Sequence, residues 1–170
     1  SVPFYSYVDV ENENIAQKQQ IGASAAKCVS SGDILFFDSG TTVPHACYAL
    51  AKRISSGDLN NLTIFTNSLV NMNILSPHCT VTLIGGEYRP NRRDFCGYIS
   101  EESLRLLSFS KCFIGADGYD EAAGFTTTDF QTARLVQLAI ARSENKYVLV
   151  DSSKFSKKSF VSHAKNDDID

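Results

Sequence analysis

The sequence repeats one pattern along its length: a short run of β-branched or aromatic residues, then turn residues, then an amphipathic helix. The run Ile34–Phe37 is followed by turn residues and then by apolar residues at helical spacing, Val43, Ala46, Cys47 and Leu50. Apolar residues at i, i+3, i+4 and i+7 line one face of a helix, and a short unbroken apolar run is typical of a strand buried on both faces. Strands that alternate with helices predict an α/β fold with a mainly parallel sheet.

Further units of the same kind follow. We expect strands at residues 63–66, 81–84, 112–114 and 147–150, and helices at 14–29, from 43, at 69–75, from 100 and at 129–143. Crossover helices cover both faces of a parallel sheet. No internal repeat or linker divides the 170 residues, a length that suits one domain. The sequence therefore predicts a single domain over residues 1–170, with helices on both faces of its sheet.

Composition and charge exclude several classes of protein. The 16 Lys and Arg against 19 Asp and Glu give a net charge of -3, whereas domains that hold nucleic-acid backbones carry a basic surplus. We find no apolar run long enough for a membrane helix and no secretory signal. The five cysteines lack C-x-x-C spacing, which indicates reduced cysteines in a cytoplasmic protein. The three histidines show no ligand spacing, so no metal and no cofactor are expected.

Polar and glycine-rich clusters follow each predicted strand. They lie at residues 38–42, 66–68, 85–86, 115–118 and 151–154. The carboxyl ends of parallel strands meet at one edge of the sheet, where ligands bind in open α/β folds. Turn chemistry alone also produces such clusters. We favour a binding site, because these loops carry hydroxyl, carboxylate and lysine groups as well as glycine.

The cluster Asp38-Ser39-Gly40-Thr41-Thr42 is the sharpest of these signals. A phosphate is held by several backbone N–H groups, by hydroxyl donors and by the positive end of a helix dipole, with a glycine that allows close approach. The cluster stands between a strand and a helix and offers all of these features. It is neither a Walker A loop nor a G-x-G-x-x-G fingerprint. The alternative is ordinary helix capping by Thr41 or Thr42.

Charged residues on the same edge complete the candidate site. Lys154 follows the last strand, where it would hold a phosphate or sugar oxygen, unless it is simply a solvated surface lysine. Asp117 lies between two glycines, Gly115 and Gly118, and either accepts hydrogen bonds from sugar hydroxyls or forms an Asx-turn. Arg89, Arg92 and Arg93 either cover an anionic ligand or form a solvated loop.

Six motifs, in order and with matching spacing from about residue 17 to residue 160, carry a resemblance: Asp38-Ser39-Gly40-Thr41-Thr42, Thr66-Asn67-Ser68, Ile84-Gly85-Gly86, Phe95-Cys96-Gly97, Gly115-Ala116-Asp117-Gly118 and Asp151-Ser152-Ser153-Lys154-Phe155. The set resembles the effector-binding, C-terminal sensor domain of DeoR-type bacterial transcriptional repressors. This resemblance implies a fold similar to ribose-5-phosphate isomerase, glucosamine-6-phosphate deaminase and CoA transferases. It also implies a helix-turn-helix domain upstream of residue 1 that binds DNA.

The resulting expectation is a domain that binds a phosphorylated sugar and thereby modulates the binding of DNA. The phosphate would lie on residues 38–42 with Lys154 as charge partner. The sugar would be lined by Thr66, Asn67, Gly85, Gly86 and Asp117.

We expect no enzyme activity, and keep a sugar-phosphate isomerase-like enzyme as the alternative. Isomerisation needs a base within reach of the carbon beside the carbonyl. In the isomerases that the chain resembles, a carboxylate stands early in the helix where this sequence has Leu135 and Val136. Asp129, Asp120 or Glu121 could replace it only if a loop carried one of them inward. A binding protein without any DNA domain is a further alternative.

Self-association is also expected. Helix-turn-helix regulators bind two half-sites on DNA together, so they work as symmetric oligomers. Candidate surfaces are residues 88–98 and the amino-terminal segment 2–10, in which Phe4, Val8 and Val10 alternate and could add a strand.

Overall fold

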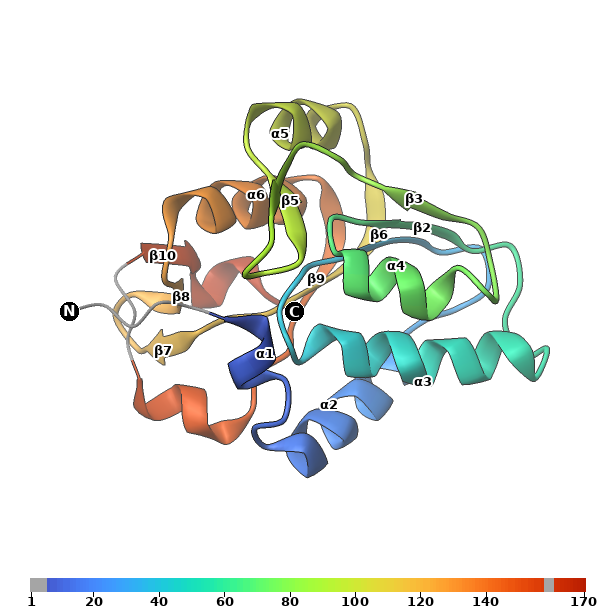
Figure 1. The fold of residues 1–170 in the computed structure, drawn as a ribbon, viewed down its shortest axis with the longest axis horizontal. Helices are drawn as coiled ribbons and strands as arrows, with labels where there is room; N and C mark the ends of the chain where they lie inside the picture. Colours follow the sequence, from blue (N-terminus) through green and yellow to red (C-terminus); the bar gives the residue numbers. More distant parts are fainter. Residues whose placement is uncertain (1–5, 158–160) are drawn as a thin grey trace.

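The computed structural model describes residues 6–157 and 161–170. Its centre is a five-stranded parallel sheet in the order β3-β2-β1-β6-β9 (Figure 1). These strands are β1 (Ile34–Phe37), β2 (Thr63–Thr66), β3 (Val81–Leu83), β6 (Phe109–Ile114) and β9 (Ser143–Val148). The predicted parallel sheet is therefore confirmed.

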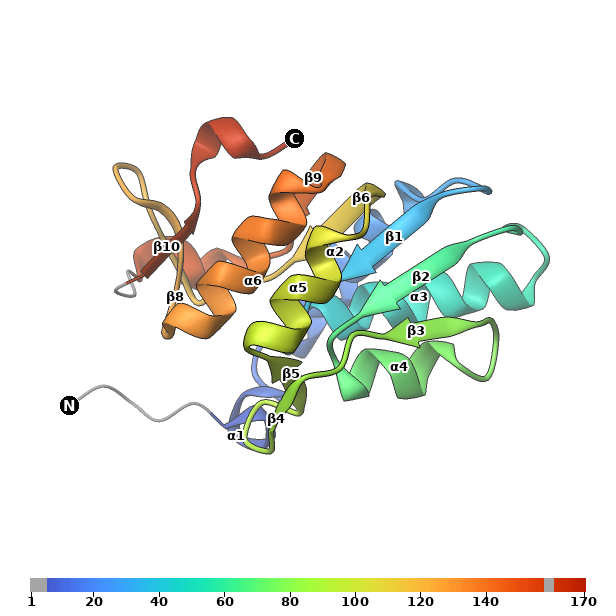
Figure 2. The ribbon, with the colours of Figure 1, turned by 90° about the horizontal axis from the view of Figure 1, so that it is seen from above.

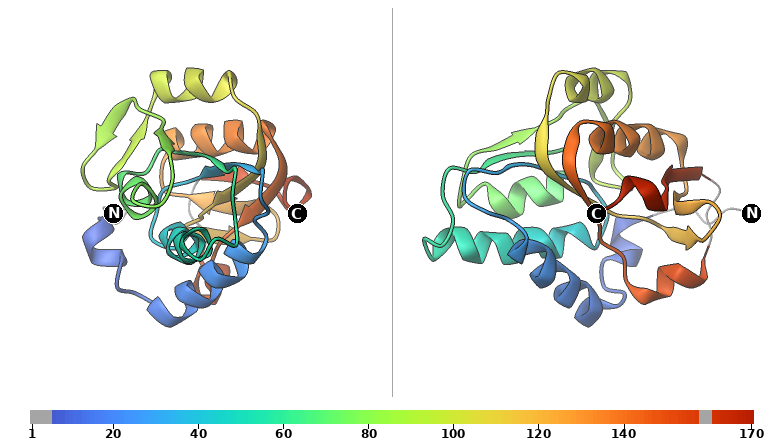
Figure 3. Two further views of the ribbon diagram at one scale, coloured as in Figure 1. Left: turned by 90° about the vertical axis from the view of Figure 1, so that its right-hand side faces the viewer. Right: turned by 180° about the vertical axis from the view of Figure 1, so that it is seen from behind.

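Helices cover both faces of this sheet, as predicted. On one face lie α2 (Ile15–Lys27), α3 (Val43–Ser55) and α4 (Leu69–Leu75), and on the other lie α5 (Tyr98–Arg105) and α6 (Phe130–Ala141) (Figures 1 and 3). Within the described residues, no helix is both long and apolar enough to cross a membrane.

Alternation along β1 divides the core into two apolar clusters. Leu35 and Phe37 pack with residues of α2, α3 and α4, and Phe36 packs with residues of α5 and α6 on the opposite face. All three side chains are 1% exposed or less. Successive residues of a strand point to opposite faces of a sheet, so one four-residue strand anchors both helical layers.

Two smaller antiparallel sheets lie beyond the main sheet and were not predicted (Figure 2). One is the hairpin of β4 (Glu87–Arg89) and β5 (Asp94–Cys96). The other has the order β10-β8-β7, with β7 (Gly118–Asp120), β8 (Gly124–Thr127) and β10 (Val161–Ala164). Two short 3₁₀ helices complete the structure, η1 (Ser152–Ser156) and η2 (Asn166–Asp168).

Two expectations about element positions were wrong. The last parallel strand begins at Ser143 rather than at residue 147, because it pairs with the whole of β6 from Phe109 onward. The described part of the amino-terminal segment is helical: α1 (Tyr7–Val10) is closed by the hydrogen bond from the Glu11 N–H to the Tyr7 carbonyl (2.9 Å). Residues 2–5 of the expected added strand, including Phe4, lie outside the described residues.

Candidate functional site

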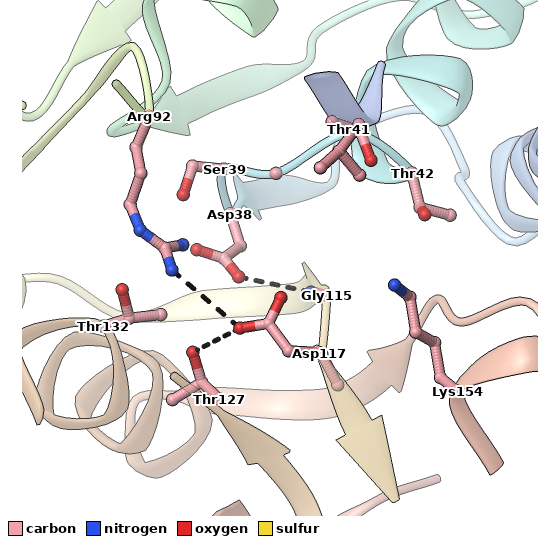
Figure 4. A pocket seen from close by; sticks show the side chains of 13 residues that line it. Asp38, Ser39, Thr41, Thr42, Arg92, Gly115, Asp117, Thr127, Thr132 and Lys154 are labelled. Atoms are coloured by element: carbon pink, nitrogen blue, oxygen red, sulfur yellow. Dashed lines mark hydrogen bonds and ion pairs between the residues drawn. The ribbon is translucent and has the colours of Figure 1, made fainter. Parts of the chain in front are cut away.

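A pocket lies at the carboxyl ends of β1 and β6, bordered by α1, the β7–β8 hairpin and η1 (Figure 4). Its enclosed volume is ≈ 40 Å³, and the whole empty space, which includes the part open to solvent, is ≈ 490 Å³. The lining residues are Val10, Asp38, Ser39, Gly40, Thr41, Thr42, Arg92, Gly115, Ala116, Asp117, Thr127, Thr132 and Lys154. The predicted edge of the sheet therefore does carry a polar pocket.

The loop between β1 and α3 forms one wall of this pocket. Gly40 has φ +102°, a conformation that side-chain-bearing residues rarely adopt. Within the described residues, the structure gives no hydrogen-bond acceptor to the backbone N–H groups of Gly40, Thr41 and Thr42. Thr42 precedes α3, but its side chain makes no capping hydrogen bond. Unused donors and the positive end of the α3 dipole thus meet at the pocket.

Asp38 lies at the base of the pocket and is 3% exposed. Its Oδ2 accepts a hydrogen bond from the Gly115 N–H (3.2 Å), and its backbone carbonyl accepts one from Asn71 Nδ2 (2.7 Å). Its Oδ1 has no hydrogen-bond partner among the described residues. Burial raises the pKa of the Asp38 carboxyl to about 7, against the N–H groups of Gly115 and Ser39, which lower it.

Asp117 and Arg92 form the opposite wall. Asp117 Oδ2 accepts hydrogen bonds from Thr127 Oγ1 and from the Thr128 N–H, both at 3.0 Å. Arg92 Nη2 lies 3.9 Å from Asp117 Oδ2 and 3.1 Å from Asp129 Oδ2. The hydrogen bonds of Asp117 therefore run to the end of β8, away from the turn in which it stands.

A second arginine ties this wall to the β1 loop. Arg89 donates to both oxygens of Asp94 (2.8 and 3.0 Å) and to Asp129 Oδ1 (2.9 Å). Asp94 is fully buried and also accepts a hydrogen bond from Ser39 Oγ (2.7 Å). Burial alone would lower the pKa of Arg89, but the hydrogen bond and charge of Asp94 outweigh it and raise that pKa. This network joins the β4–β5 hairpin, the β1 loop and the start of α6.

Two lysines supply positive charge. Lys154, on η1, lines the pocket and has no ion-pair partner in the described part of the chain. Lys18, on α2, is 1% exposed, and its Nζ donates to the Val10 carbonyl (3.0 Å). Burial and the charge of Lys154 lower the pKa of Lys18.

Comparison with known families identifies the domain. The model of the DeoR C terminal sensor domain matches residues 13–170. The chain belongs to this family. The resemblance seen in the motifs is thereby confirmed.

Curated relatives of this DeoR sensor domain are repressors. The chain is 36% identical over 161 residues to the lactose phosphotransferase system repressor of Staphylococcus aureus strain N315, covering 92% of the chain and 61% of that repressor. It is 34% identical over 161 residues to the repressor of the same name from Streptococcus mutans, with the same shares covered. The chain therefore spans about three fifths of the length of these relatives.

Solved structures show the same fold at low sequence identity. Ribose 5-phosphate isomerase A from Methanocaldococcus jannaschii has a TM-score of 0.62 and 17% identity, covering 84% of this chain and 55% of its own. A D-ribose-5-phosphate isomerase in complex with phospho-erythronic acid has a TM-score of 0.62 and 14% identity, covering 82% and 53%. eIF2B delta from Chaetomium thermophilum has a TM-score of 0.60 and 18% identity, covering 95% and 57%. The expected similarity to the isomerase fold is confirmed.

Seven of the predicted site residues of the sensor domain line the pocket, and four do not. Asp38, Ser39, Gly40, Thr41, Thr42, Asp117 and Lys154 come together there. Thr66 Oγ1 instead donates to the Phe37 carbonyl (2.6 Å), and Asn67 Nδ2 donates to the Phe95 carbonyl (2.9 Å). Both side chains are 1% exposed or less.

Gly85 and Gly86 also lie outside the pocket lining. The Gly85 carbonyl accepts a hydrogen bond from Ser100 Oγ (2.6 Å). A Cβ at Gly86 would stand 2.2 Å from the same Ser100 Oγ, so this glycine allows α5 to approach closely. Ligand contact by these two glycines, and by Thr66 and Asn67, stays a prediction.

The site predicted from the sequence lacks several lining residues. Arg92 belongs to the arginine-rich segment. The sequence left two interpretations of this segment equally open, a cover over an anionic ligand and a solvated loop, and Arg92 is 7% exposed. Thr127 and Thr132 stand in a threonine-rich stretch whose position relative to the pocket depends on the β7–β8 hairpin. Val10 reaches the pocket from the amino-terminal segment, and no sequence signal indicates this contact.

Proposed function

We propose that this DeoR sensor domain binds a phosphorylated sugar in the pocket and thereby alters the DNA affinity of an attached helix-turn-helix domain. The observation that carries the proposal is that N–H groups at the start of α3, to which the described residues give no acceptor, meet the charge of Lys154 at one pocket. Backbone donors, a helix dipole and a flexible cation together favour an anionic, phosphate-like group.

The opposite wall favours hydroxyl groups. Asp117 presents a carboxylate, which can only accept hydrogen bonds when ionised. A sugar phosphate matches both halves of the pocket, with its phosphate toward Gly40 and Lys154 and its hydroxyls toward Asp117. Two comparisons support this class of ligand: one isomerase of the same fold is in complex with phospho-erythronic acid, and the curated relatives are repressors of a lactose phosphotransferase system.

The amino-terminal segment supports coupling between the pocket and an upstream domain. Val10 lines the pocket, and Tyr7 packs against the arginine-rich loop, where Arg93 lies 5.0 Å from the centre of its ring. The Tyr7 N–H also donates to the Asn91 carbonyl (2.7 Å). A ligand that changes the position of Val10 or Arg92 would therefore change the attachment of α1. Such differential contacts are what allostery requires.

Binding without turnover is the accompanying proposal. Leu135 and Val136, at the place of the isomerase base, are 2% and 0% exposed and belong to the core below α6. Asp129 is held by Arg89 and by the Thr132 N–H (2.7 Å). Asp120 accepts hydrogen bonds from the N–H groups of Ala122 and Ala123. These groups are therefore engaged in structure rather than aimed at a ligand.

A thermal-shift screen over phosphorylated sugars tests the proposed ligand class. A compound at 100 times its dissociation constant adds about 2.7 kcal/mol of stability. We expect phosphorylated sugars to raise the melting temperature and their unphosphorylated counterparts to leave it unchanged. Incubation of the best binders with the protein, followed by NMR, should show no isomer formation. Turnover near 1 s⁻¹ would instead favour the isomerase alternative.

The expected homo-oligomer stays a prediction. Tyr88 and Tyr98 are 40% and 77% exposed, so the candidate surface over residues 88–98 presents two aromatic side chains. Light scattering at tens of micromolar protein checks this expectation. A monomer at that concentration would count against it.

A further inference from the structure

We propose that Asp38 is not a phosphate ligand but a specificity-determining residue, whose Oδ1 accepts a hydrogen bond from a hydroxyl group of the bound sugar phosphate. This inference rests on the proposed function and extends it. In this arrangement residues 40–42 and Lys154 bind the phosphate end of the ligand, and Asp38 binds a hydroxyl group at the base of the pocket.

The geometry around the carboxyl group leaves one oxygen for a ligand. Oδ2 is used by the Gly115 N–H, while Oδ1 has no hydrogen-bond partner among the described residues, although Asp38 is only 3% exposed and lines the pocket (Figure 4). A buried carboxylate oxygen without a donor is costly, and native proteins rarely leave one unsatisfied. Oδ1 therefore requires a donor from within the pocket.

Two polar side chains beside Asp38 already make hydrogen bonds to other groups. Ser39 Oγ donates to Asp94 Oδ2 (2.7 Å). Asn71 Nδ2 donates to the backbone carbonyl of Asp38 and to Thr66 Oγ1 (2.7 and 3.2 Å). Neither supplies the missing hydrogen bond, which the proposed contact with the ligand would provide.

The fully ionised phosphate group of a sugar phosphate cannot fill this role. Its second pKa is about 6, so at pH 8 it offers only acceptor oxygens and negative charge, and two anions in a buried site repel each other. Asp94, which is fully buried close by, adds to this repulsion and raises the pKa of Asp38. A hydroxyl group has the O–H that a carboxylate needs and carries no charge. The site therefore distinguishes a sugar phosphate from a phosphate without a suitably placed hydroxyl.

The identity of the residue agrees with this role. Burial of the carboxyl group raises its pKa to about 7, so an ionised Asp38 destabilises the folded state. Asparagine has nearly the same shape and could still accept from the Gly115 N–H without carrying a charge. A group that the fold does not need and that faces a pocket indicates a ligand contact.

Calorimetric titration of the wild type, Asp38→Asn and the control Asp58→Asn tests the inference. Asp58 is an exposed partner of Arg53. The probes, at pH 8, are glucose 6-phosphate, galactose 6-phosphate, fructose 6-phosphate, ribose 5-phosphate and methyl phosphate, which is a phosphate monoester without a hydroxyl group. Asp38→Asn should weaken the tightest sugar phosphate at least tenfold, since a charge-assisted hydrogen bond is lost. It should leave the affinity for methyl phosphate unchanged or higher, and the control should change neither.

A second measurement needs no variant. Monodeoxy analogues of the tightest sugar phosphate are titrated against the wild type, and one of them should bind at least tenfold more weakly. The inference is overturned if no analogue does so, or if Asp38→Asn weakens sugar phosphate and methyl phosphate equally or not at all. If no sugar phosphate binds the wild type, the proposed function itself fails and this inference fails with it.

Discussion

The backbone carbonyl of Val10 accepts a hydrogen bond from the buried Nζ of Lys18 (3.0 Å), while Val10 itself lines the pocket. The helix α1 is thus held by a cation whose pKa responds to Lys154 on the pocket wall. Lys18→Met should release α1, because it removes a hydrogen bond from a charged donor, which contributes about 1.5–3 kcal/mol. The amides of Tyr7 and Glu11 should then exchange with solvent about tenfold or more faster.

Hydrogen exchange followed by mass spectrometry or NMR measures this effect. The matched control is Lys27→Met, an exposed lysine at the other end of α2. If the amides of α1 exchange as slowly in both variants as in the wild type, Lys18 does not hold α1 and the coupling route through Val10 is wrong.

Gly40→Val should abolish ligand binding while the protein stays folded. A Cβ at Gly40 meets no atom within 4 Å, so the expected cost is the backbone strain at φ +102°, about 1–3 kcal/mol. The new side chain would crowd the loop that the phosphate approaches. Gly32→Val is the control, because Gly32 has φ +87° and equally open surroundings but lies outside the pocket lining. Equal binding by the two variants, measured by calorimetry, would reject the phosphate loop.

Arg89→Met should destabilise the protein by about 3–5 kcal/mol, because it leaves the buried Asp94 carboxylate without its main partner. Arg89 is 14% exposed in its side chain and Asp94 is 0% exposed. In the control Arg105→Met, the ion pair with Glu102 is about half exposed, and the expected loss is at most about 1 kcal/mol. Urea denaturation compares them. Similar losses of unfolding free energy in both variants would show that the buried Arg89 network contributes no more stability than the exposed ion pair.

Asp38→Asn should stabilise the protein in a pH-dependent manner. The folded-state pKa of Asp38 is about 7 against an ordinary 3.8, so the folded protein binds more protons than the unfolded chain between these values. Wild-type stability therefore falls as pH rises through this window, and the loss is complete above pH 7. The variant lacks this slope, so its advantage should grow from nearly nothing at pH 4 to a few kcal/mol, on the order of the shift, at pH 8. A constant difference between the two proteins in urea denaturation at both pH values would contradict the buried ionisation.

Local patterns were enough to predict the parallel sheet and its helices. Residues such as Leu35, Phe36 and Phe37 follow periodicities that any buried strand must have, and the glycine and hydroxyl groups of residues 40–42 stand where a strand meets a helix. These features depend only on neighbours in sequence. The loop at the pocket could therefore be predicted from the sequence without a structure.

The direction in which the side chains of Thr66 and Asn67 point could not be predicted from local sequence patterns. Thr66 pairs with Phe37 in the sheet register, and this places its hydroxyl on the neighbouring Phe37 carbonyl. Asn67 Nδ2 donates to the carbonyl of Phe95, which stands on β5 of the β4–β5 hairpin. Such contacts depend on long-range pairing, as does the approach of Val10 and Arg92 to a pocket built mainly from distant segments.

The most direct test of the proposed sensor is a paired calorimetric titration with the phosphorylated and unphosphorylated forms of one sugar, using the wild type, Lys154→Ala and the exposed control Lys157→Ala. We predict that the wild type and the control bind the phosphorylated form, that Lys154→Ala binds it at least tenfold more weakly with an unchanged melting temperature, and that the unphosphorylated form binds poorly to all three, since the donors at the start of α3 would lack their anion. Equal affinity of the wild type for both forms would contradict the account.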